Sequence, residues 1–540
     1  MKCSKRFLML IMVVLAVIAL QACGGGGGGN GGSAQTGAVQ LSLTDAPGDF
    51  DHVYITVKDV WFHTSDVADP RASDWLKYPL STPVTLDLLS LANGNMQSLW
   101  NNIQLPIGNY QQIRIFLVPT YTSNPPGGHQ YYNEVVVGSS TYPLYIPDAD
   151  HGIKLDGTFS VTAGGTLKLA IDFDAGHDIV EFHEGSDYVL KPRLGYFDLD
   201  KAGAIIGKLS TGGTFTNAAR FVIKAERLAT SEELLDSGST NTFHVIRRWT
   251  VPKPDGSFIL YPVSTRVTST WDIVIRGLNT ETMIIKGVPV PKDSTPLSDA
   301  TDLGTISTST TSTPDYSVAG TVLSPTGAWV QFYQTLAGTG EYPYEIRFRH
   351  FNPLWGGFKQ SFMLNNDQIE VGNFVSNGVI SAFTPTTPFE GLGGYDAVAG
   401  AILFDRSTPV LVSSSTTTVA FTTPLKVMSP YQGNSVTGAI VLNNPVMMDN
   451  KMDSGLLLAM EGGMIVDTIS INSQIVTGGT YTITDLPGGS PAIPLPGAFY
   501  GIDAVGWSTS NPLYKSIAIP QIVDLRTGDD SATVNMLPLW

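Results

Sequence analysis

The densest group of side chains that could do chemistry lies between residues 172 and 184. The candidate metal ligands there are Asp172, Asp174, His177, Asp178 and His183. Zinc takes imidazole nitrogen and carboxylate oxygen as ligands, and calcium takes carboxylate oxygen. Asp172 and Asp174 are two residues apart, so on a strand they share one face and could chelate together. The pattern predicts a divalent metal site, and no other cofactor is expected.

A second interpretation of the same residues needs no metal. Aspartates at the end of a strand commonly stabilise a turn by accepting hydrogen bonds from nearby backbone amides. The sequence leaves both interpretations open. It contains no Cys-x-x-Cys-His, Gly-x-Ser-x-Gly, His-Glu-x-x-His or Walker loop. A role without catalysis is therefore favoured, although a triad assembled from distant segments stays open.

One cysteine is placed for covalent lipid attachment. The segment Leu20-Gln21-Ala22-Cys23 follows a basic start and an apolar run from residue 7, which is short for a membrane span. It resembles a bacterial lipobox. It predicts a signal peptide over residues 1–22 and lipidation of Cys23, and a retained transmembrane helix is the alternative. Gly24, in place of the aspartate that retains lipoproteins at the inner membrane, favours the outer membrane, with either side open.

The residues after Cys23 predict a flexible tether. Residues 23–34 are mostly glycine, and about ten such residues span roughly 20 Å as a random coil. The other cysteine, Cys3, would leave with the signal peptide, so no disulfide is expected.

Composition narrows the class of protein. The 540 residues hold 31 Lys and Arg against 47 Asp and Glu, a net charge of −16, which argues against a nucleic-acid partner. Only 14% of residues are charged, while Gly (56) and Pro (34) are abundant. This balance is typical of a turn-rich extracellular β protein.

The candidate metal ligands must be positioned by short strands, because the sequence shows short runs of alternating apolar and polar residues rather than long helical patterns. Clear examples are 39–43, 53–57 and 166–171. Two short helices are expected, at 86–91 and at 232–235 with Ser231 as N-cap. The fold class is therefore predicted to be mostly β, with serial immunoglobulin-like or transthyretin-like sandwiches and few short helices.

Residues 35–200 form the first predicted domain, and four segments of it carry a family resemblance. These are Leu41–Pro47 with the strand at 53–57, Leu105–Arg114, Gly152–Leu155, and Leu169–Asp174 with Leu190–Pro192. The domain resembles the family catalogued as domain of unknown function 4382, common in bacterial lipoproteins. The resemblance implies a β-rich envelope domain and no established activity.

The remaining chain is predicted to hold three β-sandwiches, at 201–306, 317–428 and 434–540. An extended, unpacked Ser/Thr/Pro linker is expected at 307–316. Each unit opens with a Gly-containing strand (204–209, 317–322, 435–440). A middle strand (258–260, 380–383, 481–483) and an aromatic-led strand (271–275, 395–398, 500–505) follow.

This rhythm is similar to carboxypeptidase-regulatory-like and transthyretin-like sandwiches. Asp255–Phe258 carries the similarity, and the two later units lack this Asp-Gly turn.

Aromatic runs are a second set of candidate binding residues. They stand at 61–63, 131–132, 332–333 and 350–355. Aromatic platforms suit carbohydrate or protein partners, and core packing is the alternative. We therefore expect a lipid-anchored cell-envelope protein with a binding or structural role toward another envelope component, such as a protein, or an extracellular polymer. A metal-dependent module or enzyme is the alternative.

Overall fold

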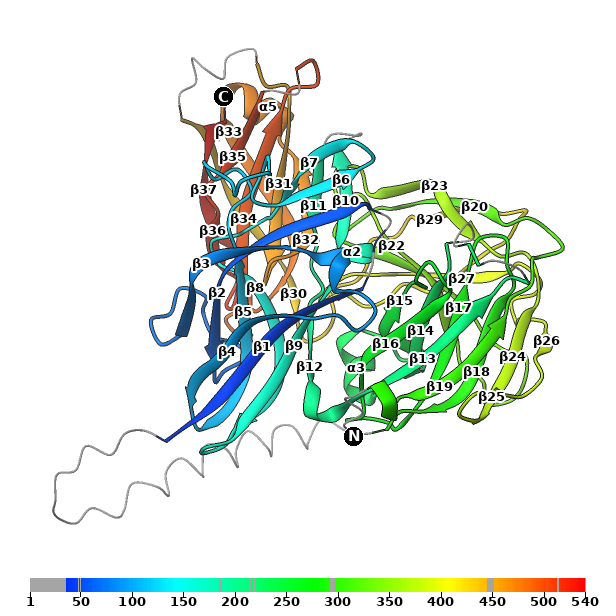
Figure 1. Ribbon diagram of the computed structural model, residues 1–540. Coiled ribbons are helices and arrows are strands. Elements are labelled where there is room, and N and C mark those ends of the chain that lie inside the picture. The colour runs from blue at the N-terminus through cyan, green and yellow to red at the C-terminus, as the bar shows by residue number, and fades with distance from the viewer. Residues whose placement is uncertain are drawn as a thin grey trace.

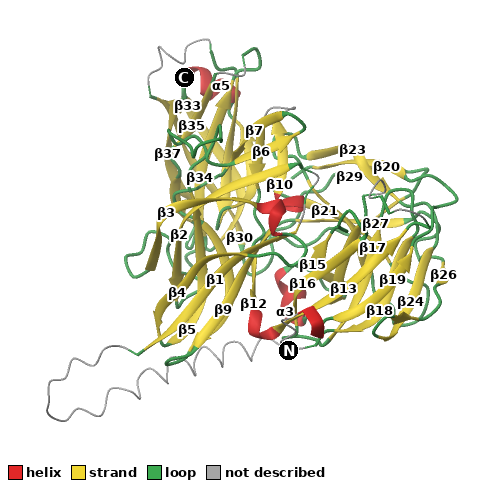
Figure 2. Cartoon of the chain, in the orientation of Figure 1, coloured by secondary structure: helices red, strands yellow, loops and turns green. Residues whose placement is uncertain are grey.

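The computed structural model describes residues 35–46, 48, 50–183, 187–212, 215–216, 220–291, 297–443, 451–511 and 514–539. Strands dominate these residues and the helices are short (Figure 2). The predicted class, mostly β in serial domains, is confirmed. Within the described ranges, the search for a helix that could span a membrane found none.

The first unit consists of a sheet of order β12-β9-β1-β4 and a sheet of order β10-β11-β7-β6-β2-β5-β8, with β3 paired to β2. Its elements are β1 (Thr36–Ala46), β2 (His52–His63), β3 (Leu76–Asp87), η1 (Leu88–Leu91), β4 (Gln97–Pro106), β5 (Gly108–Leu117), β6 (Glu134–Val137), β7 (Ser140–Tyr145), β8 (Ile153–Val161), β9 (Thr166–Asp174), α2 (Ala175–Asp178), β10 (Ile179–His183), β11 (Asp187–Leu190), β12 (Gly195–Asp198) and η2 (Leu199–Lys201). The alternation in β1 buries Val39, Leu41 and Leu43 completely, as the sequence pattern predicts.

The second unit comprises β13 (Ala202–Ser210), β14 (Val222–Leu228), α3 (Ser231–Asp236), β15 (His244–Thr250), β16 (Ser257–Ser264), β17 (Thr270–Arg276), β18 (Thr282–Pro289), η4 (Leu297–Asp299) and β19 (Thr301–Ser307). The third comprises β20 (Tyr316–Val322), β21 (Trp329–Gln334), β22 (Tyr344–His350), β23 (Gly357–Leu364), β24 (Ile369–Ser376), β25 (Val379–Ile380), β26 (Thr384–Thr386), β27 (Tyr395–Gly400), β28 (Val410–Val412) and β29 (Thr418–Phe421). The fourth comprises β30 (Gln432–Leu442), β31 (Ser454–Glu461), β32 (Met464–Ser470), α5 (Asn472–Thr477), β33 (Gly479–Gly488), β34 (Phe499–Trp507), β35 (Lys515–Ala518), β36 (Gln521–Asp524) and β37 (Asp530–Pro538).

The three later units repeat one topology. Their first strands, β13, β20 and β30, each lie between an antiparallel middle strand and the parallel last strand of the same unit. Their other strands run β15-β14-β17-β18, β22-β21-β27-β28 and β32-β31-β34-β35, and in the fourth unit this run continues through β37 into one sheet with β30 and β33. In the first unit, β1 likewise lies between antiparallel β4 and parallel β9. The shared rhythm of the sequence is therefore a shared strand order.

One segment of the third unit joins the sheet of its neighbour. β24 pairs in parallel with β18 of the second unit, and β25 and β26 pair with β24. Phe374, Ile380 and Phe383 pack on the core of the second unit. The middle strand expected at 380–383 is therefore wrong, because these residues cover the edge of a neighbouring sheet and β23 takes that place. The units also interlock more than the predicted boundary between 201–306 and 317–428 implies.

The predicted linker is largely exposed, and a buried ion pair fixes its C-terminal end. Asp315 lies fully buried and pairs with Arg276, whose side chain is equally buried, at 2.5 Å between Nη2 and Oδ2. The amide of Asn279 also donates to Asp315 (3.0 Å), and the amide of Thr311 donates to the carbonyl of Asn279 (3.1 Å). Residues 312–314 are exposed, whereas Asp315 is buried because the buried Arg276 requires a carboxylate partner.

Both expected helices are present with shifted starts. The first is η1, because residues 86 and 87 still belong to β3. The second, α3, is capped by Thr230 rather than Ser231. The Thr230 hydroxyl accepts from the Glu233 amide, and the Glu233 carboxylate accepts from the Thr230 amide. This reciprocal arrangement is a capping box.

The units pack against one another. One buried cluster contains Val274 of the second unit, Phe332 of the third and Tyr500 of the fourth. The first unit (blue to cyan) lies beside the fourth (orange to red), and the second and third (green to yellow) lie together on the other side (Figure 1).

Candidate functional site

The predicted metal cluster lies at the end of β9 and in α2, where the first unit meets β15 of the second. Asp172 and Asp174 do share a face, but both are used by protein partners. Asp172 Oδ1 accepts from Nη1 of Arg248 at 2.5 Å. Arg248 Nη2 also donates to Thr44 Oγ1 and to the carbonyl of Asp45, both at 3.0 Å. The arginine is only 1% exposed.

Asp174 has the role that the second interpretation of the sequence gives it. Its carboxylate caps α2 by accepting from the amide (3.1 Å) and Nδ1 (2.7 Å) of His177. It also accepts from Nε1 of Trp249 at 2.9 Å. We call this set, with Arg248 and Asp172, the acidic joint.

Burial sets the protonation of the acidic joint. Burial raises the pKa of Asp172 to about 7, although Arg248 opposes the rise. Burial also acts to raise the pKa of Asp174, but the charge of His177 and the hydrogen bonds from His177 and Trp249 outweigh it and lower that pKa. Burial and the charge of Asp174 hold the pKa of Asp178 well above its ordinary value.

The remaining predicted ligands are also placed. Asp178 Oδ2 accepts from the amide of Arg193 at 3.1 Å. His183 ends β10, and its side chain lies outside the described residues. Among the side chains that are described, no three His, Asp or Glu residues form a group that could hold a metal ion. The metal site stays a prediction, and the interactions present at these residues are those of a joint between units.

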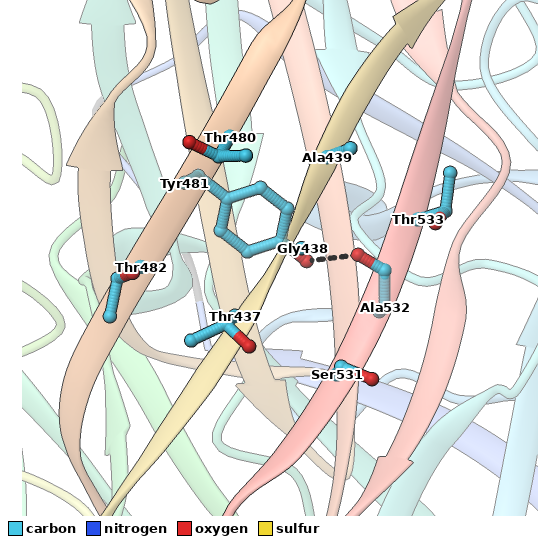
Figure 3. Close-up of a pocket in the computed structure, with 9 residues that line it drawn as sticks. All are labelled: Thr437, Gly438, Ala439, Thr480, Tyr481, Thr482, Ser531, Ala532 and Thr533. Carbon is cyan, nitrogen blue, oxygen red and sulfur yellow. Dashed lines mark hydrogen bonds between the residues drawn. The ribbon is translucent and has the colours of Figure 1, made fainter.

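A different surface offers room for a ligand. A solvent-open hollow of about 490 Å³ lies over the middle of β33, β30 and β37. Alternation along these strands turns one set of side chains outward, and we call it the hydroxyl face (Figure 3): Thr437, Thr480, Thr482, Ser531 and Thr533. All five are exposed.

The register arranges the hydroxyl face in two rows. Thr437 pairs with Thr482 on one side and Ser531 on the other, so the first row carries three hydroxyls. Ala439 pairs with Thr480 and Thr533, so the second row has a methyl group at its centre. Strand spacing and pleat set a grid of about 5 Å by about 7 Å.

The opposite side of the same strands explains why Gly438 stands in β30. The Tyr481 hydroxyl donates to the carbonyl of Ala532 at 2.8 Å (Figure 3). A Cβ on Gly438 would lie 1.8 Å from that carbonyl oxygen and 2.9 Å from the Tyr481 hydroxyl. Sequence reasoning noticed this glycine but missed the hydroxyl face, whose signal is the alternation Thr-x-Thr at 480–482 and Ser-x-Thr at 531–533.

The part of the chain that carries Asp172, Asp174 and His177 matches a known family. Residues 36–192 match the family model described as a domain of unknown function, DUF4382. The resemblance expected from the sequence is thereby confirmed for this domain. A search of the curated proteins gave no match.

Solved structures are similar only at low identity. They include the TIE protein of Bacillus anthracis (8% identity, 98% of this chain and 78% of that chain covered, TM-score 0.14). Two B repeat units of the collagen-binding protein of Staphylococcus aureus show 8% identity, with 93% and 99% covered and a TM-score of 0.12. The shaft pilin SpaA of Lactobacillus rhamnosus shows 9% identity, with 41% and 97% covered and a TM-score of 0.15. At these scores the similarities carry no argument about function.

The DUF4382 domain has a second joint, with the fourth unit. The Tyr145 hydroxyl donates to Asp503 Oδ2 at 2.5 Å, and the amide of Asp148 donates to the same oxygen at 3.3 Å. Lys154 pairs with Glu461 at 3.4 Å. Burial raises the pKa of Asp503 to about 7. The domain is thus held on two sides by buried polar contacts.

Proposed function

We propose that this chain is a lipid-anchored protein of the outer membrane with a binding role, and that the hydroxyl face contacts an extracellular polymer. The observation that carries the binding role is the regular grid of exposed hydroxyls over the hollow. No acidic or basic side chain lines the hollow within the described residues. Such a surface offers hydrogen bonds to a neutral, hydroxyl-rich ligand.

A repeating ligand fits this surface best. A polymer whose units repeat along the rows can meet several hydroxyls at once, so weak contacts add through effective concentration. Individual hydroxyl contacts are worth only about 0.5–1.5 kcal/mol each. A polysaccharide is the class of polymer that supplies repeated neutral hydroxyl groups.

The binding test measures retention on polysaccharide particles. Thr480→Val with Thr482→Val removes two hydroxyls while keeping the β-branched shape, and we expect retention on the host's own exopolysaccharide to fall several-fold. Ala439→Thr completes the second row, and we expect it to raise retention. Thr418→Val, an equally exposed threonine on β29, is the matched control. Equal retention of all four proteins on every polysaccharide tried would reject the polymer-binding role.

The anchor is proposed from the sequence motif at Cys23. In the native host, metabolic labelling with an alkyne fatty acid should mark the wild type and Cys3→Ser, and leave Cys23→Ser unlabelled. The unlabelled variant should also leave the membrane fraction, because stable anchoring needs the acyl chains. Label on Cys23→Ser would show that the chain is not anchored in this way.

The metal-dependent alternative has a direct test at the acidic joint. Protein refolded after chelator treatment is dialysed against zinc and then against calcium, and bound metal is counted. Stoichiometric metal that disappears in His183→Gln would revive this alternative. Its absence would leave the joint as the function of the cluster.

A further inference from the structure

A small crevice lies where the DUF4382 domain meets the third and fourth units. Residues that line it include Lys191, Arg193, Trp329, His350 and Ile465. Its free volume is about 10 Å³, close to the space of one water molecule or one monatomic ion. Any occupant is therefore a single small species.

Among the described residues, the side-chain nitrogens of His350 and Lys191 have few hydrogen-bond partners. His350 is buried, and neither of its ring nitrogens has a hydrogen-bond partner among the described residues. Among the described residues, the buried Lys191 donates from Nζ to the carbonyl of Phe351, at 3.3 Å. Arg193 stands at the open side, with its guanidinium carbon 4.6 Å from the ring centre of Trp329 and 5.1 Å from that of Phe348.

Burial and the neighbouring cations disfavour positive charge on the groups that line the crevice. Burial lowers the pKa of His350 well below its ordinary value, and Lys191, Arg193, His177 and Arg349 lower it further. Burial and Arg193 lower the pKa of Lys191 to about 7, and Asp178 alone opposes them.

None of the described lining residues is acidic. The nearby carboxylate of Asp178 accepts from the backbone amide of Arg193 instead. Lys191 is buried, and a buried cation without a compensating charge is unfavourable.

We propose that this crevice binds one small monatomic anion, of the size of chloride, between Lys191, His350 and Arg193. An anion accepts a hydrogen bond from whichever His350 nitrogen carries the proton, and it compensates the charges of Lys191 and Arg193. The small free volume favours a monatomic anion over a larger one. The site joins three units, so the anion would stabilise their arrangement. It is independent of the hydroxyl face on the fourth unit.

The direct test is diffraction from wild-type crystals grown in sodium bromide, with data collected at the bromine absorption edge. We expect an anomalous peak in the crevice. Ordinary electron density in the crevice without an anomalous signal would indicate a water molecule and would overturn the proposal.

In solution, the unfolding temperature is compared in sodium chloride and in sodium gluconate at equal ionic strength. The wild type should show a saturable increase specific to chloride, and Lys191→Met should lose it. Lys201→Met, which removes a lysine whose side chain is 53% exposed, should keep it. His350→Phe keeps an aromatic side chain but removes both ring nitrogens. It is the second variant, should Lys191→Met fail to fold. A chloride response that survives both substitutions would refute the proposed site.

Discussion

Replacing Arg248 with methionine is the sharpest test of the acidic joint. The side chain is 1% exposed and that of its partner Asp172 is 18% exposed, so little solvent screens the pair. Arg248 also holds Thr44 and the carbonyl of Asp45. Breaking a buried pair by removing one partner costs about 3–5 kcal/mol, because the other charge is left uncompensated.

The pKa of Asp172 determines how this loss depends on pH. With Arg248 present, burial already raises that pKa to about 7, so without the arginine the carboxyl will take up a proton more readily. Protonation removes the orphaned charge. We therefore expect Arg248→Met to lower the free energy of unfolding by about 3 kcal/mol at pH 8 and by less at pH 6.

The wild type has its own pH dependence with a defined sign. The folded pKa of Asp172 lies above the ordinary value of 3.8, so the folded state binds the proton more tightly than the unfolded state. The contribution to stability is fully present below about pH 4 and is lost as the pH rises through about 7. It amounts to at most about 4 kcal/mol.

The assay is urea unfolding of the wild type and the variant at pH 6 and pH 8, followed by circular dichroism and tryptophan fluorescence. Arg71→Met is the matched control, because Arg71 pairs with Asp69 but is 49% exposed. It should cost less than about 1 kcal/mol. Adding Asp172→Asn to Arg248→Met should recover part of the loss, since no charge is then left unpaired. Equal losses for Arg248→Met and Arg71→Met would refute the reasoning.

Three further outcomes are expected. Asp503→Asn should make the stability of β34, measured by hydrogen–deuterium exchange, depend less on pH between 5 and 8. In the wild type the pKa of buried Asp503 is raised to about 7, so ionisation of this carboxyl costs stability as the pH rises through that value. Gly438→Val should destabilise by more than about 2 kcal/mol in thermal unfolding, because a Cβ would lie 1.8 Å from the carbonyl oxygen of Ala532. Arg276→Met should cost about 3–5 kcal/mol in urea unfolding, because Asp315 would remain fully buried without its partner, and a loss below 1 kcal/mol would contradict this.

Strand positions could be predicted because a strand that is buried on one face alternates apolar and polar residues along the sequence. Val39, Leu41 and Leu43 show this in β1. The destination of residues 369–386 could not be predicted. Their pattern reads as strand, but nothing local says which sheet edge they join, and the unpaired edge of β18 lies about 80 residues earlier in the chain.

The sequence alone could group Asp172, Asp174 and His177, but it could not identify Arg248 as a partner. Asp172 and Asp174 share a face as expected, yet Arg248 stands 76 residues away from Asp172 in the sequence, and a distant cation leaves no local signal. The same limit applies to Asp315. The Ser/Thr/Pro composition around it indicates solvent exposure, while the ion pair with Arg276 buries it.

Charged and uncharged polar side chains occupy different parts of the molecule. Ion pairs lie between units, at Arg248 with Asp172 and at Lys154 with Glu461. The geometry of these pairs fixes how the units meet. Uncharged hydroxyls stand on the outward face of β30, β33 and β37. Charged pairs are directional and suit fixed joints, whereas hydroxyls donate and accept equally well. A surface of hydroxyls can therefore meet a polymer in more than one register, which a surface of fixed charges would resist.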